Sequence, residues 1–234
     1  MKKLKAIIIL ILSLICIIIL SVGSFVLIGA IQAKLFLPKE YIMWIFKSPS
    51  LRLVFIYEWY IIFGFAYIFS KDLRAFILWV INSKQSFIKR HKMSFIFTFV
   101  ILNIVLMYTI LYNVTVITNN KIINYTFLSP QGKEYGYNDI VKIDTGVYGK
   151  KQYTHSKGDF YYIIQLNDGT KIDLTEMGGA KNDDDPRFII EKLDSQYVNM
   201  GISKVSSMDN FEYCTKHLDK IYTDKIRNIL VNIK

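Results

Sequence analysis

MSFIFTFVILNIVLMYTILYNVTVI, residues 93 to 117, is the stretch of sequence that decides the fold. It contains no charged side chain, and it is longer than the ~20 residues that a helix needs to cross a bilayer. The basic cluster Lys89, Arg90, His91 and Lys92 precedes it, and a region of ordinary soluble composition follows it. We therefore interpret this stretch as a membrane span that joins two different halves.

Two further apolar runs lie on the N-terminal side of this span. Residues 6 to 31 carry no charge, and the run is longer than the ~7–15 apolar residues of a secretory signal, so it predicts an uncleaved first span. Residues 53 to 70 just reach spanning length. The sequence thus predicts a membrane region over 1–118, with three α-helical spans near 6–31, 53–70 and 93–117, and a soluble α+β domain over 119–234.

Two shorter segments of the membrane region have a mixed character. Residues 32 to 50 combine aromatic and cationic side chains, which is typical of the headgroup layer, and we expect this segment to lie along the membrane surface. Residues 76 to 81 form an apolar patch that is too short to cross a bilayer. This patch predicts an interfacial helix.

The net charge of +10 comes entirely from the membrane region. Residues 119–234 hold 16 Lys plus Arg and 16 Asp plus Glu, which leaves 29 − 16 = 13 basic and 19 − 16 = 3 acidic residues for 1–118. Basic residues in membrane loops follow the positive-inside rule, so the charge does not indicate a nucleic-acid partner. The lipid bilayer is the partner that this distribution predicts.

The same charges predict an orientation. The N-terminus has three basic residues and the loop 71–92 has six, against four between the first two spans. Nine against four predicts a cytoplasmic N-terminus, and three spans then place the C-terminal domain outside the cytoplasmic membrane. If residues 53–70 did not cross, that domain would lie inside. Heavy use of Ile, Lys, Asn and Tyr is typical of an AT-rich genome and indicates a bacterium.

The soluble half begins with alternating, β-branched segments that predict short strands. These are residues 122–128, 134–137 and 140–147, with a turn expected at Ser129-Pro130-Gln131-Gly132, followed by 160–166 and 170–174 around Asn167-Asp168-Gly169. A three-residue loop with Gly169 left-handed pairs Ile164 with Ile172 and collects the apolar residues on one face. We therefore predict that form of hairpin.

Helical periodicity replaces the strand pattern after Gly179. Asp185 is a suitable N-cap, Pro186 fits the first turn, and Gly201 ends the helix. Apolar residues recur at spacings of three and four from Phe211 to the end of the chain, which predicts a second helical stretch interrupted near Thr223.

Three consecutive acids, Asp183, Asp184 and Asp185, resemble a cation site because carboxylates are good ligands for Ca²⁺ or Mg²⁺. Their spacing does not fit a calcium-binding loop. Helix capping and the helix dipole account for acids at this position, so we predict no metal site.

Two other groups are candidates for nucleophilic chemistry. Cys214 and His217 are three residues apart, and on one helix they would share a face, which can activate a thiolate. Cys214 also falls on an apolar stripe, where a thiol behaves as a small buried hydrophobe. His155 lies in a polar loop and has no partner signature in the sequence. We assign no catalytic residue and no cofactor.

Glu58 is the ionisable residue inside the second apolar run. An acid in a span is by default a functional hypothesis because its burial in lipid is unfavourable. Its predicted depth is under ~10 Å, at ~1.5 Å per residue from the start of the run. Contact with headgroups and with Arg52 is therefore the interpretation that we adopt.

The order of membrane spans followed by short strands and a helix, with KEYGYNDIVKIDTGVYGK leading to FYYIIQLNDGTKIDL, resembles the membrane-attached bacterial PH-like domains. The pattern of Tyr137, Asp139 and Ile140 is similar to an aromatic-dipeptide-Ile pattern in that family, and the resemblance covers residues 120–200. It implies a binding or scaffolding domain without catalytic residues.

These observations together predict a multi-pass protein of the bacterial cytoplasmic membrane. We expect its soluble domain to bind or scaffold another envelope or membrane protein and not to act as an enzyme. An accessory subunit of a membrane transport or export complex is the alternative, and a membrane-anchored enzyme is the third hypothesis.

Overall fold

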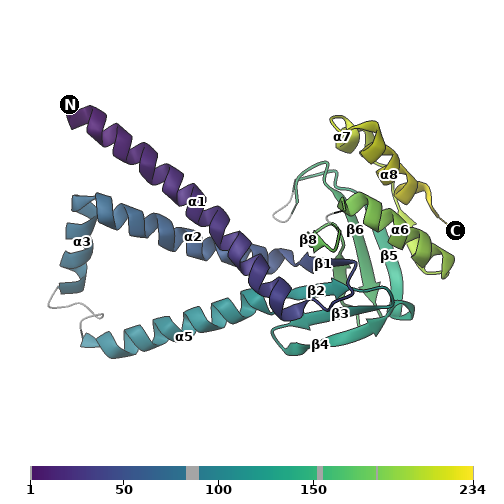
Figure 1. Cartoon of the computed structure of the whole chain (residues 1–234), viewed down its shortest axis with the longest axis horizontal. Coiled ribbons are helices and arrows are strands. Elements are labelled where there is room, and N and C mark those ends of the chain that lie inside the picture. Colours follow the sequence, from purple (N-terminus) through teal and green to yellow (C-terminus); the bar gives the residue numbers. More distant parts are fainter. Residues whose placement is uncertain (1, 83–89, 152–154, 183, 234) are drawn as a thin grey trace. The chain divides into compact units, whose positions relative to one another are not determined.

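The computed structural model describes residues 2–82, 90–151, 155–182 and 184–233 (Figure 1). The chain divides into two compact units. The first unit contains Met1–Gln32 and Pro49–Leu111, and the second contains Ala33–Ser48 and Tyr112–Lys234. This division differs from the predicted boundary at residue 118, because the segment between the first two apolar helices belongs to the second unit.

The first unit is helical. It consists of α1 (Lys2–Phe36), α2 (Ser48–Phe69), α3 (Lys71–Asn82) and α5 (Lys92–Leu111). Three of these helices, α1, α2 and α5, are long and apolar enough to cross a membrane. Many of their large apolar side chains are exposed, which is typical of a surface that meets lipid. The three predicted apolar helices are thus confirmed, and α3 covers the predicted interfacial patch at 76–81.

Helix α5 ends earlier than the apolar run that predicts it. The side-chain amide of Gln32 is fully buried, and its Nε2 donates to the carbonyl oxygens of Ile110 at 3.0 Å and Leu111 at 3.3 Å. The last carbonyls of a helix lack partners inside the helix, so Gln32 from α1 satisfies the end of α5. The following residues, Val114–Ile117, form strand β2. The predicted span 93–117 was therefore wrong in its last six residues, because Val-Thr-Val-Ile is both apolar and β-branched.

The second unit contains two sheets (Figure 1). The first has the order β4-β3-β2-β1-β8 and the second has the order β7-β6-β5-β9. The strands of the first sheet are β1 (Met43–Phe46), β2 (Val114–Ile117), β3 (Lys121–Thr126), β4 (Ser129–Gly136) and β8 (Met177–Ala180), and those of the second are β5 (Ile140–Val147), β6 (Phe160–Leu166), β7 (Lys171–Asp173) and β9 (Ser203–Ser206).

The prediction that residues 32–50 lie along the membrane surface was wrong, because Met43–Phe46 of this segment form strand β1. It pairs antiparallel with β2 on one side and with β8 on the other. Met43 and Ile45 are fully buried in the main hydrophobic cluster, and Trp44 packs against Gly178 and Gly179, where any Cβ would clash with the indole. The aromatic and apolar residues of this segment are buried by a sheet rather than by headgroups.

The β6–β7 hairpin has the predicted form. Ile164 pairs with Ile172, Leu166 accepts a hydrogen bond from the Gly169 amide, and Gly169 has φ +83°. The buried residues Tyr162, Ile164 and Leu166 alternate with more exposed ones along β6. By contrast, the turn expected at Ser129–Gly132 was wrong. The chain turns at Phe127 and Leu128, and Ser129 already pairs with Thr126 in the β3–β4 ladder.

Helix α6 (Pro186–Asn199) matches its predicted signals. The Asp185 side chain accepts the Arg187 amide at 2.9 Å, and Gly201 has φ +79°. The region after Gly201 departs from the prediction of one helical stretch. It first forms strand β9, which is parallel to β5. Two helices follow, α7 (Phe211–Thr215) and α8 (Lys220–Val231). The interruption of the helical stretch is therefore at residues 216–219, before the predicted position near Thr223.

A buried ion pair holds the C-terminal elements on the domain. Lys204 of β9 and Asp194 of α6 lie 2.5 Å apart with side chains 2 % and 1 % exposed. Asp194 also accepts the Tyr162 hydroxyl at 2.8 Å and the Asn232 amide at 2.7 Å. Lys204 donates further to the backbone carbonyls of Ile229 and Asn232. Every charge of the pair thus has several partners, as burial requires.

Candidate functional site

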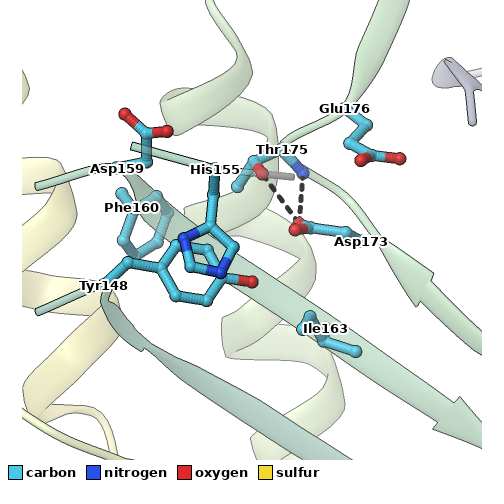
Figure 2. A pocket seen from close by; sticks show the side chains of 8 residues that line it. All are labelled: Tyr148, His155, Asp159, Phe160, Ile163, Asp173, Thr175 and Glu176. Atoms are coloured by element: carbon cyan, nitrogen blue, oxygen red, sulfur yellow. Dashed lines mark hydrogen bonds between the residues drawn. The ribbon is translucent and has the colours of Figure 1, made fainter. Parts of the chain in front are cut away.

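A pocket of about 530 Å³ lies in the second unit beside the β5–β6 connection (Figure 2). Ile163 and Asp173 are paired neighbours on β6 and β7, and they point away from the face that buries Ile164 and Ile172. The pocket is therefore on the outer face of the second sheet. Its lining residues are Tyr148, His155, Asp159, Phe160, Ile163, Asp173, Thr175 and Glu176.

Two stacked rings, those of Tyr148 and His155, line this pocket. The imidazole of His155 lies parallel to the ring of Tyr148, with centroids 3.3 Å apart and an interplanar angle of 6°. Tyr148 packs in turn on Tyr161 at 4.5 Å. Figure 2 shows the His155 and Tyr148 rings overlapping, with Asp159 and Asp173 on either side of them. Nδ1 of His155 is buried and has no hydrogen-bond partner among the described residues.

The backbone next to the strands fixes the position of these rings. The Tyr148 amide donates to the Asp159 carbonyl at 3.0 Å, and the Gly158 amide donates back to the Tyr148 carbonyl at 2.8 Å, which extends the β5–β6 ladder beyond Val147. Gly158 has φ +92°, and a Cβ there would lie 2.6 Å from the ring of Tyr213. The glycine therefore allows both the turn and the close packing of α7 against this connection.

Asp173 is a pocket carboxylate that three hydrogen bonds hold in place. Its Oδ1 accepts the Thr175 amide at 2.9 Å, the Thr175 hydroxyl at 2.7 Å and the Tyr162 amide at 3.3 Å. Figure 2 shows the two bonds from Thr175. Burial nevertheless raises the pKa of Asp173 above its ordinary value, because these bonds and the nearby His155 compensate only part of the lost hydration.

The surroundings of the stacked rings are negatively charged. Burial raises the pKa of Tyr148 to about 12, and the charges of Asp173, Glu176 and Asp144 act in the same direction. Asp159 accepts the Ser156 amide at 2.6 Å. Lys47, at the end of β1, is the cation that interacts with Glu176, and burial lowers its pKa to about 8. Lys47 Nζ donates to the Asn124 side chain and to the Tyr125 carbonyl.

A pocket with this composition suits an organic cation. An ammonium or guanidinium group can lie over an aromatic ring, and it can donate hydrogen bonds to carboxylates at the rim. Among the described residues, no group of three or more His, Cys, Asp or Glu is arranged to hold a metal ion. The lining residues offer such a ligand charge, hydrogen bonding and ring stacking.

The acidic run is explained by the helix that follows it. Asp185 caps α6 and also binds the Arg187 guanidinium at 2.8 and 2.7 Å. Those contacts lower the pKa of Asp185. Asp184 is exposed and precedes the cap, and Asp183 lies outside the described residues.

Cys214 and His217 do not share a helix face. Helix α7 ends at Thr215, and His217 lies in the turn after it. Cys214 packs with Phe211 and Leu218 in a small hydrophobic cluster, and burial raises the pKa of its thiol. A raised thiol pKa opposes thiolate formation, so this site favours packing over nucleophilic chemistry.

Glu58 lies in α2 and is half-buried. The candidate span within α2 is Arg52–Phe69, so Glu58 lies six residues, or ~9 Å, from its start. Its proposed contact with headgroups and Arg52 stays a prediction.

A comparison of the chain with protein-family models, with curated proteins and with solved structures gives no match. The site is therefore interpreted from its own geometry. Sequence reasoning found His155 but gave it no partner, and it missed Tyr148 and Asp173. Asp173 belongs to a hairpin whose register the sequence does predict, so its position on the outer face of the sheet was the available signal.

Proposed function

We propose that the chain is a multi-pass membrane protein that presents a non-catalytic binding domain, and that this domain is built from the loop 33–48 together with residues 112–234. The observation that carries this proposal is the position of β1 between β2 and β8. A loop that connects two apolar helices supplies an inner strand of the sheet. The domain is thereby continuous in the chain with all three apolar helices, which would hold it at the bilayer.

The pairing of β1 with β2 also constrains the number of crossings. Strands that share a sheet lie in the same aqueous compartment, because unpaired backbone groups are not tolerated in lipid. The chain therefore crosses the bilayer an even number of times between Phe46 and Val114. Helix α3 has 12 residues, too few to span, so α2 and α5 either both cross or both stay out. The strong apolar character of α5 favours crossing, and α2 then crosses as well.

Because α2 and α5 cross together, the orientation no longer depends on the weakly apolar residues 53–70 alone. With three crossings, the N-terminus and the loop 71–92 lie on one side, and both parts of the domain lie on the other. Nine basic residues against four favour a cytoplasmic N-terminus and an extracytoplasmic domain at a bacterial cytoplasmic membrane.

The pocket beside Tyr148 is the proposed binding site of the domain, and an organic cation is the proposed ligand class. Tyr148, His155 and Phe160 line the pocket with aromatic side chains, and Asp159, Asp173 and Glu176 supply negative charge. A cationic side chain of another envelope or membrane protein is a ligand of this class. Cys214 packs in a hydrophobic cluster and Asp185 caps α6, and these structural roles support binding rather than catalysis.

The resemblance to membrane-attached bacterial PH-like domains stays part of this proposal. Two sheets of mainly antiparallel strands followed by α6 support it. Strand β1, the parallel strand β9 and the helices α7 and α8 are additions to such a plan. The resemblance supports a binding role, and the pocket chemistry supports it independently.

Calorimetric titration of the full-length chain in a nonionic detergent tests the ligand class. The probes are n-butylammonium and butyrate, which have similar size and opposite charge, at equal ionic strength. We expect the ammonium to bind and butyrate not to bind. Asp173→Asn should weaken ammonium binding about tenfold, or ~1.4 kcal/mol, because it removes the charge and keeps an acceptor for Thr175. Glu134→Gln is the matched control, since Glu134 is exposed, paired with Lys121 and outside the pocket.

Equal binding of both probes, or preference for butyrate, would contradict a cation site. Unchanged ammonium binding in Asp173→Asn would place the cation elsewhere on the chain.

A further inference from the structure

Strand β3 is flanked by two hairpin turns of opposite chemistry. The turn before it, which joins β2 to β3, contains the exposed residues Asn119 and Asn120. The turn after it, which joins β3 to β4, contains Phe127 and Leu128. Phe127 is 46 % exposed and Leu128 is 90 % exposed, the highest value among the large apolar side chains of the described residues. A large apolar pair at the tip of a hairpin calls for a physical reason.

The strand register places these two turns at opposite ends of the sheet. Phe46 pairs with Val114, so the end of β1 and the start of β2 lie together. Thr115 pairs with Asn124, while Ile117 pairs with Ile122. The end of β3 is therefore beside the start of β2, and the Phe127–Leu128 turn extends beyond that same end. The Asn119–Asn120 turn lies at the other end.

The connections to the apolar helices identify which end this is. Helix α2 begins at Ser48, two residues after β1 ends, and α5 ends at Leu111, three residues before β2 begins. The connections to α2 and α5 thus leave the sheet at the end where the Phe127–Leu128 turn is found. The chain from α1 enters β1 at Met43, which pairs with Ile117 near the polar turn.

A cluster of aromatic side chains lies at this end of the sheet, beside the last residue of α1. The ring of Phe36, the last residue of α1, lies 5.1 Å from Tyr112 and 4.7 Å from Tyr125 at the end of β3. Lys47 donates to the Tyr125 carbonyl at 3.3 Å. The end of α1, the remaining proposed span, therefore also lies at this end of the sheet.

We infer that the Phe127–Leu128 turn inserts into the interfacial layer of the membrane in which the chain is anchored. This inference rests on the proposed membrane anchoring. Two side chains at a hairpin tip offer far less area than the ~800 Å² per partner of a stable protein interface, which favours lipid over a second protein. The inserted turn adds a membrane contact besides the connections to α2 and α5. This additional contact fixes the tilt of the domain relative to the bilayer.

Spin-label accessibility measured on the full-length chain in phosphatidylcholine–phosphatidylglycerol vesicles tests this inference. Leu128→Cys and Asn119→Cys are made separately in a Cys16→Ala, Cys214→Ala background and labelled with a nitroxide. Collision rates with oxygen, which concentrates in lipid, and with a neutral nickel chelate, which stays in water, are compared. The Asn119 position is the matched control, because it is a hairpin tip on the same strand.

We expect the ratio of oxygen to nickel accessibility to be several-fold higher at 128 than at 119, and to fall when Phe127→Ser is added. Equal ratios with high nickel access at both positions would overturn the inference. Low access of both reagents at 128 would also overturn it, since it indicates a protein contact. Flotation of the vesicles is scored separately: a chain that does not float contradicts the anchoring itself, whereas a floating chain with an aqueous residue 128 contradicts only the insertion.

Discussion

Phe46 at the end of β1 pairs with Val114 at the start of β2, although α2, α3 and α5 lie between them in the sequence. This pair joins a loop of the membrane region to the soluble domain. Because the two strands share a sheet, the location of one segment also gives the location of the other.

The topology can be read by thiol labelling of intact cells. In a background without Cys16 and Cys214, single cysteines at Lys39 and Lys150 are expected to react equally with a membrane-impermeant maleimide, because both belong to the domain. A cysteine at Lys71, after α2, is expected to react only after the cells are permeabilised. Labelling of Lys39→Cys and Lys150→Cys from opposite sides would rule out the shared sheet.

The isolated fragment 112–234 is expected not to fold, because β2 and β8 lose the strand between them and the side chains of Met43 and Ile45 leave the core. Residues 37–48 joined to Tyr112 by a short Gly/Ser linker should restore folding, since β1 ends beside the start of β2. Dispersed amide resonances in a nitrogen–proton correlation spectrum are the measurement.

The control for this experiment is the same fusion with Ile45→Asp. It retains the length and linker but buries an unpaired carboxylate, and we expect the spectrum of an unfolded chain. A well-dispersed spectrum from 112–234 alone would show that β1 is dispensable.

Lys204→Met should destabilise the domain by about 3–5 kcal/mol, because it leaves the buried Asp194 carboxylate without its cation. Lys225→Met is the matched control. The Lys225–Glu191 pair is 2.7 Å long but partly solvated, with side chains 26 % and 22 % exposed, so its loss should cost at most ~1 kcal/mol. Urea unfolding of the linked domain, followed by near-ultraviolet circular dichroism, gives both values. Similar losses in the two variants would contradict the structural role of the buried pair.

Binding of n-butylammonium should weaken on acidification, and the direction follows from Asp173. Its pKa is raised above 3.8 by burial, so the carboxylate becomes neutral at a higher pH than an exposed Asp and then no longer attracts the cation. Titrations between pH 7 and pH 4 should show this loss before ordinary surface carboxylates protonate. In Asp173→Asn the loss should move to lower pH. An affinity that rises on acidification would contradict the assignment.

Local signals in the sequence predict local structure well. The β6–β7 hairpin and α6 were predicted with their turn and cap residues, because Asn167-Asp168-Gly169 and Asp185-Pro186 act on their own neighbours. Strand β9 was missed, since its four residues carry little pattern and its partner β5 is distant in the sequence.

It was harder to predict which residues belong to the membrane region and which belong to the sheet. Met43–Phe46 is a short aromatic run near lysines, and that composition fits an interface as well as a strand. Its partners Val114–Ile117 continue the hydrophobicity of α5 without a break in composition. The pocket was missed for a similar reason, because His155 and Asp173 meet only after the β5–β6 and β6–β7 turns have formed.

The most direct test of the shared sheet is a disulfide between β1 and β2 in native membranes. Phe46→Cys with Val114→Cys, in a background without Cys16 and Cys214, places the two sulfurs across directly paired strands, where Cα atoms are ~4.5–5.5 Å apart and a disulfide can form. Phe46→Cys with Val116→Cys is the offset control, two residues out of register. After mild oxidation, mass spectrometry of the digested chain should find linked peptides in the first variant and few in the second. No link in the first variant, or equal linkage in both, would contradict the account.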